Sequence, residues 1–178
     1  MPVTDSALGM IANNAALLFG RAGQLLDGIE SARFARLARG EIGVVPANHP
    51  AWVYGHIALY PEYALRALGL EDAADALTPD DAWTARFDFN SQCQDDPDAS
   101  FYPPMATIVR KFNESFESLL EGLDAADPDA LGRDNPREGS RERFPRVGDL
   151  VNFLATGHVA YHLGQVSYWR RLEGLPPV

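Results

Sequence analysis

The chain has 178 residues, of which 46% are hydrophobic and 22% are charged, and these values predict one folded domain over residues 1–178. Its net charge of −10 argues against nucleic acid as a partner, because phosphate backbones repel an acidic surface without a concentrated basic patch. The sequence has neither the roughly 18 consecutive apolar residues of a membrane span nor a basic stripe for a membrane surface.

The N-terminal residues, MPVTDSALGMIANN, contain no basic segment leading into an apolar core, so we do not expect a secretory signal. The one cysteine, Cys93, cannot form an internal disulfide. Both features favour the reducing cytoplasm as the compartment.

Four segments carry the apolar period of a helix. The first covers residues 6–29, and the second begins at Pro50, with Asn48 or His49 as its cap, and runs to Leu68 before Gly69. The third covers residues 104–123, and the fourth covers residues 147–172. No strand alternation competes with them, so the sequence predicts an all-α protein, a four-helix bundle.

The connection between the second and third helices, residues 70–103, is long enough to cross the bundle, which allows these two helices to run parallel. It is too long to be featureless in a compact domain, and we expect short helical turns in EDAADAL and TPDDAWTARF. Residues 124–149 predict a loop, and the basic residues between 133 and 146 alternate there with acids and turn formers, which is typical of a solvated segment.

The chemistry of the sequence concentrates on the fourth helix, in GHVAYHLGQ. His158 and His162 are four residues apart, so their imidazoles project from one helix face, one turn apart. That face is mostly apolar, as Leu154 and Trp169 show, so we expect both histidines to point into the bundle, where they can chelate one metal ion.

Two histidines alone hold a metal weakly, so a third ligand is needed. His56 lies on an apolar stripe of the second helix between Trp52 and Leu59, whereas capping explains His49. The hypothesis is therefore a three-histidine site of His56, His158 and His162, weighed against the alternative that inward histidines are ordinary core residues. Three imidazoles suit zinc, nickel, copper and iron about equally well.

Other residues offer weaker chemistry. HExxH is absent because Val159 follows His158, and Glu62 lies about 240° around the helix from His56. Cys93 lies in an acidic loop that should raise the pKa of its thiol, so we interpret it as an unreactive cysteine in a connector. Gln165 is interpreted either as a side chain that orients a metal ligand or as a polar core residue.

On the motifs WVYGHIA and GHVAYHLGQ, the sequence resembles the DinB-like (DinB/YfiT) family of metal-dependent four-helix proteins over most of the chain. The resemblance implies a crossover between helices two and three, often a homodimer, and nickel, zinc or iron bound by His56, His158 and His162, with Gln165 also matching.

For function, the resemblance implies a small-molecule substrate and a low-molecular-weight thiol, in isomerase or S-transferase chemistry. Three neutral imidazoles leave a coordination position open, as in catalytic sites. The sequence therefore predicts a metal-dependent enzyme of thiol S-transfer or hydrolysis. The alternative is a non-enzymatic stress or metal-binding protein in which the ion stabilises the bundle.

Overall fold

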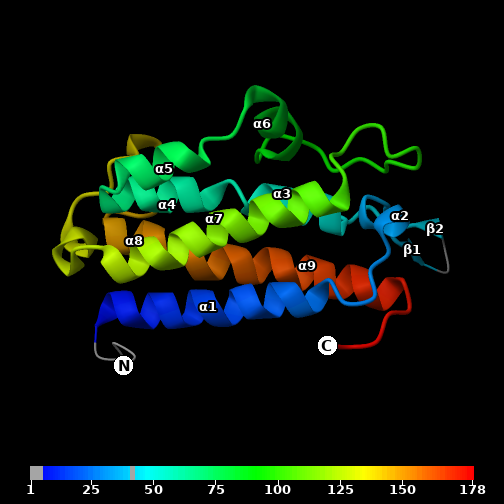
Figure 1. Cartoon of the computed structure of the whole chain (residues 1–178), viewed down its shortest axis with the longest axis horizontal. Coiled ribbons are helices and arrows are strands. Elements are labelled where there is room, and N and C mark those ends of the chain that lie inside the picture. The colour runs from blue at the N-terminus through cyan, green and yellow to red at the C-terminus, as the bar shows by residue number, and fades with distance from the viewer. Residues whose placement is uncertain (1–5, 41–42) are drawn as a thin grey trace.

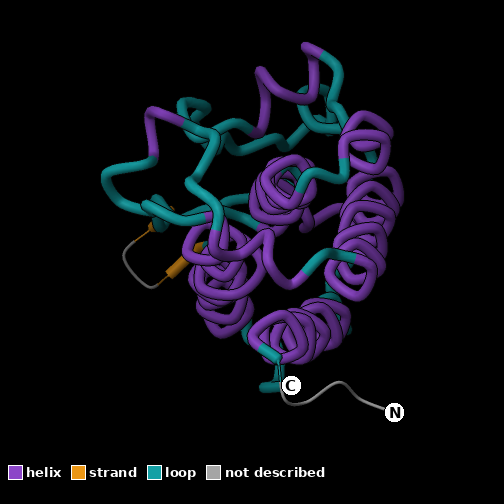
Figure 2. The backbone as a smooth tube through the Cα atoms, turned by 90° about the vertical axis from the view of Figure 1, so that its left-hand side faces the viewer, coloured by secondary structure: helices purple, strands orange, loops and turns teal. Residues whose placement is uncertain are grey.

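The computed structural model describes residues 6–40 and 43–178, and it confirms the all-α class. Four helical columns lie side by side (Figure 1). They are α1 (Ala7–Leu25), α3 (Pro50–Ile57) continued by α4 (Tyr60–Leu68), α7 (Met105–Ala125), and α8 (Val147–Asn152) continued through η3 (Phe153–Gly157) into α9 (His158–Leu172). The four columns form a closed ring, seen nearly end-on in Figure 2. Its contacts join α1 to α7, α7 to α3 and α4, α3 to α9, and α9 to α1.

The predicted helix starts and stops have visible causes. The Ser6 hydroxyl accepts a hydrogen bond from the Gly9 amide at 3.0 Å and caps α1. His49, one of the two predicted caps, accepts from the Trp52 amide at 3.1 Å, and Pro50 occupies the first helical position of α3. Gly69, with a φ of 84°, ends α4 in the left-handed conformation that glycine adopts without strain.

The columns enclose a core of interlocking aromatic side chains. Phe112 and Phe116 of α7 contact Phe19 of α1, and the fully buried Tyr54 of α3 meets Phe112 edge-on at 5.1 Å between ring centroids. Both α1 and α7 bury one face and expose the other, as the 3.6-residue period predicted, whereas every residue of α3 is buried, with α6 packed on it. None of the helices in residues 6–40 and 43–178 has both the length and the apolar character needed to cross a membrane.

The crossover is confirmed. In Figure 1 the α3–α4 column and α7 run in the same direction, and α1 and the α8–α9 column run in the opposite one. The connecting residues 69–104 therefore return along the molecule before α7 begins. They contain α5 (Glu71–Leu77) and α6 (Asp81–Phe87), the two predicted helical turns, and these pack on α4 and α3 respectively.

Several details of the fold differ from the prediction. The first helix, predicted over residues 6–29, ends at Leu25, and the second, predicted as one helix from Pro50 to Leu68, is broken between α3 and α4. A short α2 (Ser31–Phe34) follows α1, and β1 (Arg39–Gly40) pairs antiparallel with β2 (Gly43–Val44) in the turn-rich stretch. The expected loop at 124–149 contains 3-10 turns, η1 (Pro128–Gly132) and η2 (Glu138–Ser140), folded around the fully buried Asn135, whose amide donates to the Phe144 carbonyl at 2.8 Å. The fourth helix is interrupted by a π-helical segment, η3, directly before His158.

Met1–Asp5, which begin the N-terminal segment considered for a secretory signal, and residues 41–42 lie outside the described residues.

Candidate metal centre

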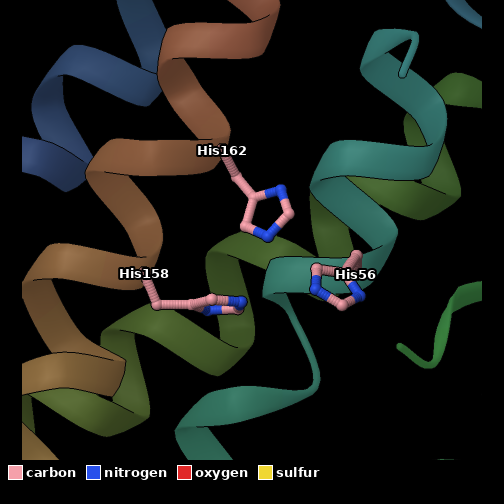
Figure 3. Close-up of side chains that lie close together, drawn as sticks. All are labelled: His56, His158 and His162. Carbon is pink, nitrogen blue, oxygen red and sulfur yellow. The ribbon is translucent and has the colours of Figure 1, made fainter. Parts of the chain in front are cut away.

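The structure brings the three predicted histidines into one cluster (Figure 3). His56 comes from α3, and His158 and His162 come from α9, one turn apart, with the rings turned toward one another. One nitrogen from each ring lies within 4.8 Å of one nitrogen of both others. The side chains are buried, with exposed fractions of 3%, 9% and 7%, so the cluster faces the interior and not bulk water.

Contacts between α3 and α9 hold the two halves of the cluster in register. The Asn48 amide donates to the Gln165 oxygen at 3.0 Å, which links the start of α3 to α9. The Trp52 ring stacks on His56, with centroids 4.5 Å apart and planes 13° apart, and it also contacts His162 at 5.9 Å. The tryptophan therefore fixes one side of the His56 ring and shields the cluster.

A backbone carbonyl orients His56. Its Nδ1 lies 2.7 Å from the Phe87 oxygen, and because a carbonyl can only accept, Nδ1 carries the proton and Nε2 keeps a free lone pair. Such an outer hydrogen bond sets the tautomer of metal-ligating histidines. The Phe87 ring reaches this position because residue 55 is glycine: a Cβ there would lie 2.3 Å from Phe87 Cε1.

The sequence interpretation missed Phe87. The available signal was Gly55, an isolated glycine inside a helix next to a proposed ligand, which usually has a packing reason.

The other two histidines differ in their surroundings. His162 Nδ1 lies 3.4 Å from the Gln165 oxygen, which Asn48 already holds, so Gln165 is placed where it can orient the ring. His158 Nδ1 is buried and has no hydrogen-bond partner among the described residues. A buried polar atom left unsatisfied is rare in folded proteins and is a frequent mark of a functional site.

Burial keeps all three imidazoles neutral. Desolvation lowers the pKa of His56, His158 and His162 below the usual 6.5, and the neighbouring histidines lower the pKa of His158 further. At neutral pH each ring therefore offers a lone pair. Neutral imidazole is the form that binds metal, so the protonation state fits the ligand role.

The donor set fits a borderline transition metal. Within residues 6–40 and 43–178, the cluster contains three histidines and no carboxylate or thiolate. Imidazole donors suit zinc, nickel, copper and iron, whereas calcium and magnesium prefer oxygen ligands. The cluster can therefore hold a divalent transition metal whose charge the three ligands leave uncompensated.

The remaining candidates lie outside the cluster. His49 is buried as a helix cap, and its Nε2–H donates to the Gln94 carbonyl at 2.8 Å. Cys93 accepts from the His49 amide at 3.5 Å. The pKa of its thiol is raised to about 11 as predicted, but burial is the main cause and not the acidic loop. Glu62 pairs with Arg66 at 2.9 Å, away from the histidines as expected.

Residues 24–166 of the sequence match the family described as the DinB superfamily. The matched range contains all three histidines, Gln165 and the whole crossover connection. Searches of curated proteins and of solved structures found no match.

Proposed function

This chain belongs to the DinB superfamily, and we propose that it binds one divalent metal ion through His56, His158 and His162 and acts as a metal-dependent enzyme. The reaction we favour is S-transfer from a low-molecular-weight thiol to a small electrophilic substrate, with hydrolysis as the second candidate. The observation that carries the proposal is the buried cluster of three neutral imidazoles from α3 and α9.

The number of protein ligands favours a catalytic role. Structural zinc sites are closed by four protein ligands, whereas catalytic sites keep a position open for water or substrate. Among the described residues, no fourth histidine, cysteine or carboxylate joins His56, His158 and His162. When bound, the ion would supply a Lewis acid that lowers the pKa of a coordinated thiol or water at that position.

The chain's own residues hold and shield the reacting groups. Trp52 and Tyr60 cover the histidines, with Tyr60 4.1 Å from His158 between ring centroids. Burial raises the pKa of Tyr60 to about 12, so its hydroxyl stays protonated and can donate a hydrogen bond but cannot act as a base at neutral pH. With no carboxylate in the described cluster to take a proton from water, the donor set favours a thiol over hydrolysis.

Metal binding is tested by elemental analysis after purification without an affinity tag. We expect about one ion per chain in the native protein and its loss in His158→Ala. His49→Asn is the matched control, because it removes a buried histidine outside the cluster and keeps a capping side chain. Equal metal content in the native protein and His158→Ala would contradict the ligand assignment.

Catalysis is tested separately, on protein reconstituted with zinc, nickel or iron. A panel of thiols with electrophilic substrates, and a panel of hydrolysable esters, should reveal turnover that disappears in His158→Ala. If no substrate turns over and metal removal only lowers the melting temperature, the enzymatic proposal fails. The ion would then serve to stabilise the contact between α3 and α9.

A further inference from the structure

Two rows of aromatic rings lead away from the histidine cluster, and both end at an arginine from residues 133–146. The first row follows α4: Tyr60 lies 4.1 Å from His158, Tyr63 lies 5.8 Å from Tyr60, and the Arg137 guanidinium lies 4.1 Å above the Tyr63 ring. The second row follows η3: Phe153 lies 5.7 Å from His158, and the Arg143 guanidinium lies 5.2 Å from Phe153.

Both guanidinium groups stack on aromatic rings without being neutralised, and both residues are exposed at the surface. A guanidinium stacked on an aromatic face keeps its N–H groups at the edge, where they can bind an anion in bidentate fashion. In residues 6–40 and 43–178, neither arginine side chain forms an ion pair or donates a hydrogen bond. Six other arginines of this acidic chain do have carboxylate partners; they are Arg33, Arg36, Arg66, Arg110, Arg133 and Arg146.

One acid close to Arg137 is already paired. Glu71 lines the same cavity of about 420 Å³ as Arg137 and Tyr63, and it binds Arg66 at 2.6 Å. The end of the site formed by Arg137 and Arg143, the arginine end, thus carries two guanidinium groups without a carboxylate partner in the described residues, on a chain with a net charge of −10.

We propose that Arg137 and Arg143 form an anion-recognition site for a two-ended ligand, whose thiol binds at the histidine cluster and whose carboxylate binds at the arginines. The substrate class is thus an anionic thiol and not a neutral one. This inference rests on the proposed function, since it uses the metal at His56, His158 and His162. One ring separates Arg143 from His158 and two separate Arg137 from it, so the two ends of the ligand are several bonds apart.

The test uses the Co²⁺-loaded full chain, whose absorption spectrum reports thiolate coordination. Two thiol series of matched length are titrated, ω-mercaptoalkanoates and ω-mercaptoalkanols with chains of three to eleven carbons. We expect the carboxylates to bind more tightly than the alcohols by about tenfold or more at the longer lengths, with an advantage that shrinks as salt rises. Short carboxylates should show little preference, because they cannot reach the arginines.

Variants test whether Arg137 and Arg143 themselves, and not the overall charge of the protein, cause the preference for carboxylates. Arg137→Gln combined with Arg143→Gln should abolish the carboxylate advantage and leave the affinity for Co²⁺ and for the alcohols within about twofold. Arg171→Gln is the matched control, because Arg171 also stacks on a ring, Tyr168 at 5.7 Å, at the opposite end of α9. It should keep the full carboxylate advantage.

The outcomes distinguish the two proposals. Failure of the native chain to bind Co²⁺ would refute the proposed function. Normal Co²⁺ binding with equal affinity for carboxylates and alcohols would overturn only the anionic-thiol inference. Normal Co²⁺ binding with no spectral response to either series would overturn that inference and the proposed S-transfer reaction, and would leave the metal site standing. A carboxylate advantage that survives in the double variant would overturn it as well.

Discussion

Gly55→Ala tests whether Phe87, in the connection between α4 and α7, orients His56 in the histidine cluster. The new Cβ would lie 2.3 Å, 2.4 Å and 2.6 Å from three carbons of the Phe87 ring, where ordinary contacts are about 3.5–4.0 Å. The ring is fully buried, so it must shift by about 1 Å or more. The carbonyl of the same residue accepts the hydrogen bond from His56, so the shift reaches the histidine cluster.

The expected magnitudes follow from two opposing effects. Overpacking of a core costs about 1–3 kcal/mol, and alanine gains about 1 kcal/mol over glycine within a helix. The free energy of unfolding should therefore fall by about 0–2 kcal/mol. Metal affinity should fall by about 10- to 100-fold, which is typical when the outer hydrogen bond of a ligating histidine is lost.

The assay is a competitive zinc titration against a chelator, combined with chemical unfolding of the metal-free protein. Gly122→Ala is the matched control: its Cβ would lie 2.2 Å from Leu65 Cδ2, which also overpacks a contact between two helices, α7 and α4, away from the histidines. It should lower stability and leave the zinc affinity of the folded protein unchanged. Wild-type zinc affinity in Gly55→Ala would refute the idea that the Phe87 carbonyl orients His56.

Three more predictions concern single residues and the metal itself. Burial lowers the pKa of His49 from 6.5 to about 4, so the metal-free protein should lose stability as pH falls from 6.5 toward 4. In denaturant titrations of metal-free protein, His49→Asn should reduce that loss by up to about 1.4 kcal/mol per pH unit. If the free energy of unfolding of His49→Asn changed with pH as in the native protein, this prediction would be contradicted. Gln165→Leu should weaken zinc binding about tenfold in the chelator competition, and an unchanged affinity would mean that Gln165 only fills the core. Zinc at 100 times its Kd should stabilise the native protein by about 2.7 kcal/mol, visible as a higher melting temperature that His158→Ala does not show.

The helical columns were predictable because their signals are local. The apolar period, Pro50 after a capping residue and Gly69 after the last helical turn predict where α3 begins and α4 ends, and the structure agrees. The β1–β2 pair was not predictable, because strands of two residues are too short to show an alternation of apolar and polar side chains. The fold around Asn135 depends on one buried amide in a polar segment, which composition alone predicts as solvated loop.

The histidine cluster was predictable for the same local reason, since a spacing of four on one helix and one apolar stripe on another place three imidazoles inward. The surroundings of the cluster were not predictable. The Phe87 carbonyl, the Asn48–Gln165 link and the arginines above the aromatic rows reach it through tertiary contacts between segments far apart in the chain. Such contacts leave no period in the sequence.

The π-helical segment η3 shows where the local signals themselves are incomplete. The sequence predicts one uninterrupted helix over residues 147–172, yet Phe153–Gly157 forms a wider turn directly before His158. A π-turn adds about one residue relative to an α-turn, so it changes the phase between α8 and α9 while both still bury an apolar face. Phe153, within that turn, contacts both His158 and Arg143. The irregular turn therefore lies where the histidine cluster meets the arginine end, and this location fits the tendency of π-bulges to occur at functional sites.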